Sequence, residues 1–184
     1  MSEITVEEGV YYRRADYAGV FRRLLIESVD FSVAFAVSSA LTLITLFIFM
    51  PEDTSSQAFV DRLTWILLIV WPSVWFTYLV ILKRTRFRTL GYLIGGAKIV
   101  NLQGALPGIG ALTIRLAFAT IGPINVIIDL FWITGDDNRQ ALRDKFAGTY
   151  VINKKAKPAG RGKIVYRRYS MIFNFLFREV QRPG

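Results

Sequence analysis

The chain has 184 residues, of which 53% are hydrophobic, and its formal net charge is +9. It contains no Cys and no His, which excludes disulfides, thiolate nucleophiles, thiolate metal sites and every mechanism that needs an imidazole. The hydrophobic residues fall in blocks of about twenty, the length that crosses the hydrocarbon core of a bilayer. The composition therefore indicates an integral membrane protein.

Two long hydrophobic blocks predict transmembrane helices. The first, residues 31–50, is uncharged, and the second, residues 63–82, ends at a run of basic residues. As a helix, each block would cover roughly 30 Å, which matches the hydrocarbon thickness. Pro72 lies in the middle of the second block, where a helix in lipid kinks and continues. Charges occur throughout the first thirty residues, so we expect no removable signal peptide.

A third block, residues 111–134, decides the topology. It contains Arg115 and Asp129, and Gly122-Pro123 divides it into halves that are each too short to cross a bilayer. Lys and Arg gather before the first span, after the second span and in the tail, so the positive-inside bias places all three in the cytoplasm. We therefore expect a broken or re-entrant element that dips into the membrane and returns. A third full crossing is the alternative.

Two short runs with β-branched residues, 97–104 and 148–154, have strand character. If they pair with each other, both lie on the cytoplasmic side and the third block must return between them. The alternative is that each run is a loop.

The tail beyond residue 153 starts with a basic stretch that contains Pro and Gly. Further on, apolar residues follow helical spacing: Val165, Tyr169, Ile172, Phe173, Leu176 and Val180. This spacing predicts a basic amphipathic helix that lies on an anionic leaflet or docks on a partner.

Glycine and tryptophan residues add local expectations. Gly91 and Gly95 lie in a basic segment without the G-K-[ST] of a phosphate loop, so they favour close backbone packing. Trp132 lies near the end of the third block and is typical of an interfacial anchor. Trp71 and Trp75 flank Pro72 and are expected to pack on a neighbouring helix or a partner subunit.

A stripe of charged residues precedes the first hydrophobic block. Arg23, Glu27 and Asp30 are spaced i, i+4 and i+7, so they share one face if the helix starts near residue 17. Asp30 enters the apolar block, where an unpaired carboxylate is costly. We expect a cation to pair with it, either Arg23 or a residue of the polar segments.

Three motifs around these features resemble the RDD family of bacterial and archaeal multi-pass membrane proteins. They are AG-x-F-R-R-L followed by Asp (residues 18–30), TLG-x-x-x-G-x-x-x-V (residues 89–100) and LRDKFAGTYVI (residues 142–152). The family is named for one Arg and two Asp, which the motifs match to Arg23, with Arg22 as the adjacent candidate, and to Asp30 and Asp144. At Tyr92 the family usually has a basic residue. The resemblance implies no established activity; transport and accessory roles in membrane assemblies have both been suggested for the family.

The charged residues have two interpretations. Arg23, Asp30 and Asp144 can form a buried network that locks the cytoplasmic ends of the spans to residues 142–152, which is the interpretation we favour. The alternative is that Asp30 is an ion or proton site. Folding at Gly122-Pro123 would also allow Arg115 and Asp129 to pair, either as a structural contact or as part of a transporter site.

We therefore expect an all-α membrane protein with two transmembrane helices, a third broken or re-entrant segment, a small cytoplasmic strand pair and an amphipathic C-terminal helix. The expected parts are a cytoplasmic N-terminal segment, an RDD-like membrane domain with spans at about 18–50, 63–82 and 111–134, and a basic tail; these parts cover residues 1–16, 17–152 and 153–184.

The expected function is that of a non-catalytic accessory or scaffolding subunit in the bacterial cytoplasmic membrane, with its N-terminus in the cytoplasm. A small oligomeric ion or solute transport component is the alternative. The expected partners are anionic lipids at the basic tail and a second copy or a larger membrane complex. We expect no enzymatic activity, no cofactor, no metal and no nucleic acid, because positive-inside bias already accounts for the cations.

Overall fold

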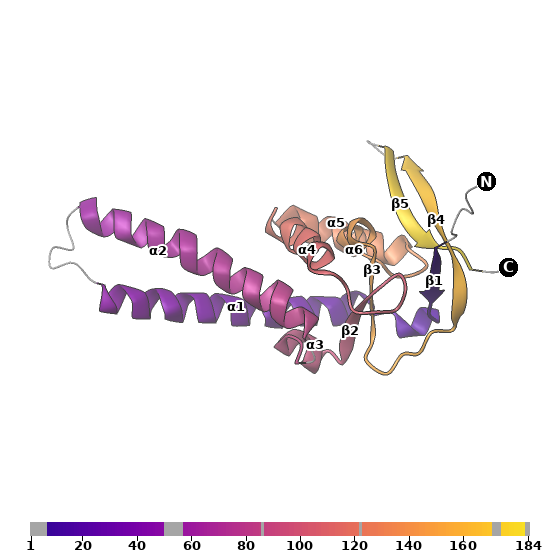
Figure 1. Ribbon diagram of the computed structural model, residues 1–184, viewed down its shortest axis with the longest axis horizontal. Coiled ribbons are helices and arrows are strands. Elements are labelled where there is room, and N and C mark those ends of the chain that lie inside the picture. The colour runs from indigo at the N-terminus through magenta and orange to yellow at the C-terminus, as the bar shows by residue number, and fades with distance from the viewer. Residues whose placement is uncertain (1–6, 50–56, 86, 122, 171–173, 183–184) are drawn as a thin grey trace.

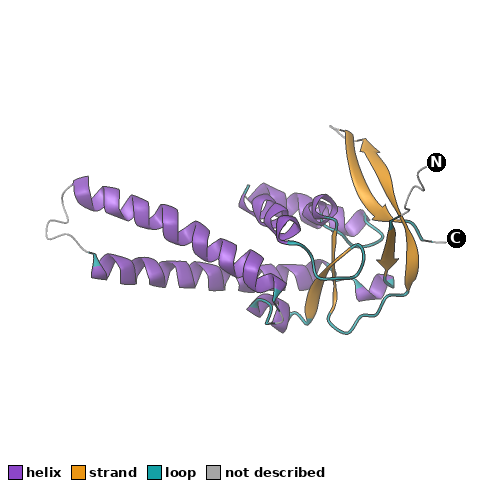
Figure 2. Ribbon diagram, viewed as in Figure 1, coloured by secondary structure: helices purple, strands orange, loops and turns teal. Residues whose placement is uncertain are grey.

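The computed structural model describes residues 7–49, 57–85, 87–121, 123–170 and 174–182. Its most prominent feature is a long antiparallel pair of helices, α1 (Val20–Ile48) and α2 (Gln57–Phe76), which extends away from the rest of the molecule (Figure 1). The second helix continues as a π-helical segment, η2 (Thr77–Leu82). Figure 2 shows that the strands lie away from the end of α1 and the start of α2.

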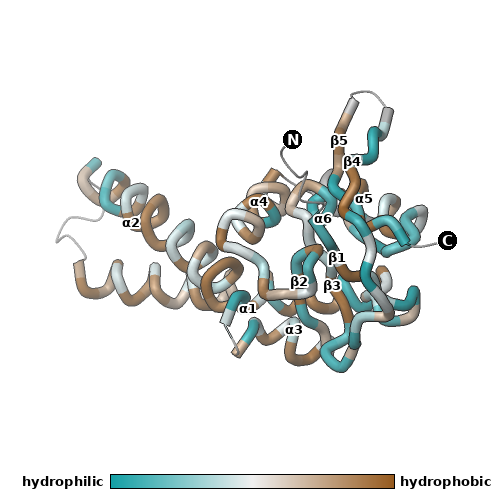
Figure 3. The backbone as a smooth tube through the Cα atoms, turned by 45° about the vertical axis from the view of Figure 1, so that its right-hand side comes forward, coloured by the Kyte–Doolittle hydropathy of each residue, from teal (hydrophilic) through white to brown (hydrophobic). Residues whose placement is uncertain are grey.

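Both long helices have the length and composition needed to cross a membrane. Only 17% and 11% of their most apolar windows are buried inside the protein, so most of their apolar side chains face outward. Figure 3 shows the hydrophobic colour along most of α1 and α2. Pro72 lies inside α2 without ending it, as predicted, and the π-helical segment begins five residues later.

The third hydrophobic block forms two short helices, α4 (Ile109–Thr120) and α5 (Pro123–Gly135). Pro123 is the first residue of α5, where its fixed φ and missing N–H are tolerated. With 12 and 13 residues, neither helix is long enough to cross a bilayer. The insertion of this pair into the membrane remains a prediction.

The ends of this block are held together by a two-stranded sheet. Strand β2 (Ala97–Asn101) precedes α4 and strand β3 (Thr149–Asn153) follows α5, and the two pair antiparallel with Ile99 opposite Val151. The chain therefore leaves the sheet, forms α4 and α5, and returns to the same sheet. Two short helices flank these strands, α3 (Leu90–Ile94) and α6 (Leu142–Ala147). The location of the strand pair on the cytoplasmic side stays a prediction.

The C-terminal tail is not the predicted amphipathic helix. It forms the strands β4 (Gly160–Ser170) and β5 (Asn174–Val180), and β1 (Glu8–Tyr11), which precedes the short 3-10 helix η1 (Arg14–Asp16), pairs with β4 to give the order β1-β4-β5. The fold is therefore not all-α, because it contains two sheets.

The alternation of side chains explains this correction. Phe177 is buried while its neighbour Leu176 is exposed, and Tyr169 is half-buried while Arg168 is exposed, as expected for the period of two of a strand. Two of the six residues of the predicted helical spacing, Ile172 and Phe173, lie outside the described residues.

Two apolar clusters join the elements at this end. The first packs α1, η2 and α4 against the strand pair and contains Ala18, Ile26, Val80, Tyr92, Ala97, Ile99, Leu112 and Val151. The second joins the N-terminal segment, the strand pair and the C-terminal sheet through Tyr12, Tyr17, Val100, Leu102, Tyr150, Ile152 and Val180. Because β1 and β4 also pair, the N-terminal segment and the tail form one structure around the strand pair.

Candidate charge network

Asp144 is the most buried carboxylate of the network. It lies in the first turn of α6 and is fully buried. Arg23 Nη1 lies 2.5 Å from its Oδ2, and Arg115 Nη1 forms an ion pair with its Oδ1. The Ala141 N–H donates to Asp144 Oδ2 at 3.2 Å, which caps the start of α6. Two guanidinium groups and a backbone donor therefore satisfy one carboxylate.

The two arginines also bind other groups, and these bonds hold several elements together. Arg23 Nε donates to the Ala18 carbonyl at 3.1 Å, and Arg23 Nη2 donates to the Arg139 carbonyl at 2.8 Å. Arg115 Nη1 donates to Thr149 Oγ1 at 3.1 Å. The network thus joins the start of α1, the middle of α4, the start of α6 and the start of β3.

The sequence left Arg115 and Asp129 as a possible pair, and the structure gives each a different partner. Arg115 binds Asp144, whereas Asp129 Oδ2 lies 3.0 Å from Arg143 Nε. Arg143 also pairs with Glu27, one of the three residues of the predicted stripe on α1. Burial, with a smaller contribution from Arg23, lowers the pKa of Arg143 to about 9. The two carboxylates therefore offset a substantial desolvation cost.

Asp30 is buried on α1 at a separate position, and uncharged groups provide most of its contacts. Thr89 Oγ1 donates to Oδ2 at 2.7 Å, and the Gly91 N–H donates to Oδ1 at 2.8 Å. Tyr78 Oη donates to Oδ1 at 3.3 Å, and Lys83 Nζ lies 3.6 Å from Oδ2. Of the two cations considered from the sequence, the structure therefore places a residue of the polar segments next to Asp30.

The position of Asp30 depends on a close approach between α1 and α3. A Cβ added at Gly91 would collide with the Ile26 carbonyl oxygen and lie 2.6 Å from Asp30 Oδ1. Tyr78 Oη also accepts a hydrogen bond from the Leu90 N–H at 3.1 Å. Asp30 and Tyr78 thus satisfy the first N–H groups of α3 from outside that helix. This is the close backbone packing that the glycine spacing predicted.

The two candidate arginines at the start of α1 are clearly different in the structure. Arg23 is buried in the network, whereas Arg22 is exposed. The structure therefore brings Arg23 and Asp144 into direct contact and leaves Arg22 at the surface. Asp30 belongs to the neighbouring site, with contacts from η2, from Lys83 and from the segment that begins α3.

Between the two sites lies a cavity of about 30 Å³. Its polar lining includes Glu27, Asp30, Lys83, Arg115 and Arg143. A polar cavity of this size has room for about one water molecule.

Sequence reasoning missed several residues of the network. Lys83, Thr89 and Tyr78 were not linked to Asp30, because no periodicity connects residues that lie about 50 to 60 positions apart. The TLG motif could have indicated Thr89 and Gly91, because it places a hydroxyl side chain two residues before the unshielded N–H of a glycine. Arg143 adjoins Asp144 in the third motif, so its charge could also have been considered.

Comparison with known proteins gives one finding. The family model described as the RDD family matches residues 17–148. No curated protein matches the chain, and no solved structure does. The match includes Arg23, Asp30, Arg115 and Asp144, so the network described above lies within it. The chain therefore belongs to the RDD family, a family of membrane proteins.

Proposed function

We propose that the chain is a non-catalytic, multi-pass protein of the bacterial cytoplasmic membrane that acts as an accessory or scaffolding subunit of a membrane assembly. One observation carries this proposal: the buried carboxylates Asp30, Asp129 and Asp144 lie against cations and hydrogen-bond donors. Such an arrangement fixes helices to one another. The absence of Cys and His from the sequence supports the expectation of no enzymatic activity, no cofactor and no metal.

The chemistry of Asp144 fits a structural role. An arginine stays protonated at any physiological pH, so two guanidinium groups keep the carboxylate charged. A proton or cation carrier must release its charge to water during each cycle, whereas Asp144 is fully buried. Separating a buried ion pair leaves an uncompensated buried charge, which is costly. The pair therefore resists opening.

The arrangement of the molecule supports a cytoplasmic location for both chain ends. Both ends and both sheets lie at the same end of the α1–α2 pair (Figure 1). This end carries the basic tail, which the positive-inside bias places in the cytoplasm. Exposed cations of β4, such as Arg161 and Arg168, are available to anionic headgroups, and we assign no nucleic-acid partner to them.

A groove between α2 and α4 is the surface where we place the contact within the assembly. Its volume is about 690 Å³, and it is lined by Trp71, Pro72, Ser73, Trp75, Phe76, Thr113, Leu116, Ala117 and Thr120. Trp71 Nε1 donates to Thr42 Oγ1 at 3.2 Å, but Trp75 Nε1 is buried without an acceptor among the described residues.

A transmembrane helix of a second copy of this chain fits this groove. Thr113, Ala117 and Thr120 provide a small-residue face on α4, which allows close approach of another helix.

A second candidate function is a small oligomeric ion or solute transport component. The observation that favours it is the water-sized cavity, which adjoins Glu27, Asp30 and Lys83. A single chain with two spans is too small to enclose a pathway, so this function also requires an oligomer.

Purification in mild detergent of the wild type and Asp30→Asn tests the proposal. Asp61→Asn is the matched control, since Asp61 is exposed on α2. The proposal expects a lower yield and a smaller assembly for Asp30→Asn, with the wild type and the control both forming the larger species.

The transport alternative predicts a different pattern in the same experiment. Asp30→Asn would then fold and assemble like the wild type, and proteoliposomes containing the wild type would show flux driven by a pH or cation gradient that the variant lacks. That result would contradict the accessory role.

A further inference from the structure

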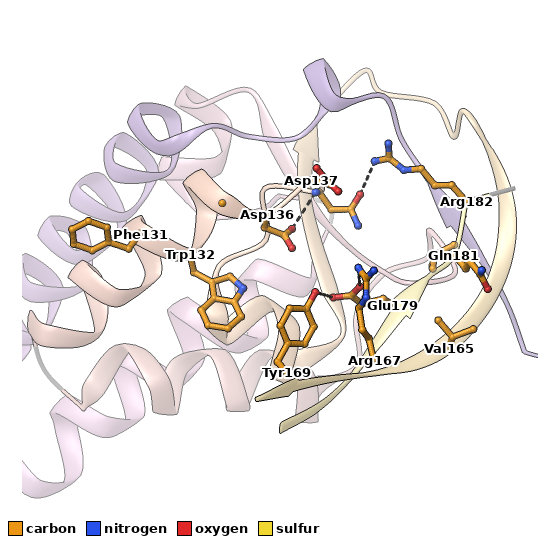
Figure 4. A pocket seen from close by; sticks show the side chains of 13 residues that line it. Phe131, Trp132, Asp136, Asp137, Val165, Arg167, Tyr169, Glu179, Gln181 and Arg182 are labelled. Atoms are coloured by element: carbon orange, nitrogen blue, oxygen red, sulfur yellow. Dashed lines mark hydrogen bonds and ion pairs between the residues drawn. The ribbon is translucent and has the colours of Figure 1, made fainter. Parts of the chain in front are cut away.

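A pocket of about 740 Å³ lies between the end of α5 and the β4–β5 hairpin, apart from the charge network (Figure 4). Trp132 enters it from α5, the turn after α5 contributes Asp136 and Asp137, and Arg167 and Tyr169 come from β4. The chain end after β5 adds Arg182. The pocket therefore combines carboxylates, guanidinium groups and aromatic rings.

The base of the pocket is held together by a buried ammonium group. Lys145 lies 2.6 Å from Asp136 Oδ1 and also pairs with Glu179. Burial lowers the pKa of Lys145, but Asp136 and Glu179 outweigh this effect and leave the pKa raised. Tyr169 Oη donates to Glu179 Oε1 at 2.7 Å. Lys145 therefore balances one of these two negative charges, and the Tyr169 hydroxyl adds a hydrogen bond to Glu179. The other charges of the pocket lie nearer the surface.

Two guanidinium groups form a positive part of the pocket. The Arg167 side chain is 67% exposed, and its Nη1 lies 3.6 Å from Glu179 Oε2. Arg182 Nη2 donates to Asn138 Oδ1 at 2.7 Å. Each guanidinium carries five N–H groups, so both retain donors for an anion. A phosphate suits such donors, because a guanidinium group binds two of its oxygens through paired N–H groups.

A negative and aromatic part faces the same space. Asp137 is exposed on the turn after α5 and lines the pocket. The rings of Trp132 and Tyr169 also line the pocket, with their centroids 5.9 Å apart. A carboxylate together with aromatic faces is the combination that binds an organic ammonium group.

The pocket also adjoins an apolar surface. Phe131 precedes Trp132 on α5 and is 74% exposed, and it contributes to the pocket lining. Figure 4 shows its side chain pointing away from the charged residues. Because Trp132 is of a residue type common at membrane interfaces, we place the mouth of the pocket at the depth where headgroups meet acyl chains, which rests on the membrane location proposed above.

We propose that this pocket binds a zwitterionic phosphoethanolamine group, as part of a membrane phospholipid. The phosphate lies against Arg167 and Arg182, and the ammonium lies against Asp137 and the two aromatic rings. The acyl chains run along Phe131. This assignment uses one ligand to satisfy charges of both signs that the described residues leave open to solvent.

Isothermal titration of the purified full chain in detergent tests the proposal with three probes. They are a short-chain phosphatidylethanolamine, a short-chain phosphatidylglycerol and free phosphoethanolamine. The wild type should bind phosphatidylethanolamine at least tenfold more tightly than phosphatidylglycerol, which lacks the ammonium. It should bind the lipid more tightly than free phosphoethanolamine, because the free compound has no acyl chains.

Two variants probe the two parts of the pocket. Arg167→Gln should weaken phosphatidylethanolamine binding about tenfold, since it removes a charge-assisted phosphate contact. Asp137→Asn should weaken phosphatidylethanolamine binding by a similar factor and leave phosphatidylglycerol binding unchanged. Arg168→Gln is the control, because Arg168 is the next residue of the same strand and points to the opposite face. All three positions are exposed, so the variants should keep the wild-type melting temperature.

Three outcomes separate the proposal from its alternatives. Equal affinity of the wild type for the two lipids would overturn it, because no ammonium subsite would exist. Equal loss in Arg167→Gln and Arg168→Gln would also overturn it by showing non-specific attraction. If free phosphoethanolamine bound as tightly as the lipid, the headgroup site would stand and its ligand would be a soluble aminophosphate. Assembly size does not enter these measurements, so they are independent of the accessory role.

Discussion

Asp30 and Asp144 are both buried aspartates of the RDD motif, but the protein satisfies them in different ways. Asp144 receives two guanidinium groups, from Arg23 and Arg115. Asp30 receives a hydroxyl of Thr89, the N–H of Gly91 and a hydroxyl of Tyr78, with one ammonium at 3.6 Å. The first site depends mainly on formal charge, and the second depends mainly on fit.

The difference follows from what each site connects. Asp144 joins elements that are separated along the chain, including α1, α4 and β3, and arginine side chains are long enough to reach across these gaps. Asp30 joins α1 to α3, whose backbones approach so closely at Gly91 that no long side chain is needed. A variant that removes charge should therefore affect the Asp144 site more, and a variant that adds volume should affect the Asp30 site more.

The largest expected effect is that of Asp144→Asn. This variant leaves Arg23 and Arg115 buried without their shared counter-charge, a loss that typically costs about 3–5 kcal/mol. We expect a fall of the melting temperature in detergent by about 10 °C or more, or no folded protein. Asp61→Asn, on the exposed face of α2, should be within about 0.5 kcal/mol of the wild type.

A double variant keeps this prediction testable if Asp144→Asn fails to fold. Arg115→Met combined with Asp144→Asn removes one of the two unpaired guanidinium groups. The double variant should therefore be more stable than Asp144→Asn alone, which a comparison of folded yields would reveal. A double variant that is less stable than either single change would show that charge compensation is not what holds this site.

Gly91→Ala should have the next largest effect. One added methyl group collides with the Ile26 carbonyl oxygen and with Asp30, so α1 and α3 must separate. Overpacking of this kind costs about 1–3 kcal/mol. Measurement of the melting temperature against Gly110→Ala gives the contrast, because a Cβ at Gly110 meets nothing within 4 Å.

The control itself should move in the opposite direction. Gly110 lies in the first turn of α4, where alanine is a better helix former than glycine. Gly110→Ala is therefore expected to be neutral or slightly stabilising. If Gly91→Ala were equally harmless, the close approach of α1 and α3 would not be a constraint on the Asp30 site.

The sequence predicts the parts of the fold that depend on local patterns. Long uncharged blocks predict α1 and α2 because a span needs little more than length and hydrophobicity. The strands β2 and β3 lie where β-branched runs indicated strand character. The tail was predicted incorrectly because Val165, Tyr169, Leu176 and Val180 satisfy a helical spacing by chance, whereas the alternation of Leu176 and Phe177 becomes decisive only once β5 packs against α6.

The candidate site was predictable in composition but not in pairing. The motifs identify Arg23, Asp30 and Asp144, and the structure brings Arg23 and Asp144 together. The partner of Asp30 could not be chosen from the sequence, because Lys83 and Arg23 are both within plausible reach of a helix of unknown packing. Tertiary contacts between α1, η2 and α3 decide this choice, and no local pattern encodes them.

The smallest expected effect is that of Lys83→Met, which isolates the one cation near Asp30. Because uncharged donors already satisfy that carboxylate, the variant should cost about 1 kcal/mol or less at pH 7, far below Asp144→Asn.

Lys83 follows the second span, and burial, partly offset by Asp30, lowers its pKa to about 8. The unfolded chain therefore binds more protons than the folded protein between about pH 8 and the ordinary lysine value of 10.5, and wild-type stability should rise with pH over that window. Melting temperatures of the wild type and Lys83→Met at pH 7, 8.5 and 10 measure this difference. A wild type that loses stability relative to the variant as the pH rises would show that Asp30 depends on the ammonium charge, and the contrast between the two aspartates would then disappear.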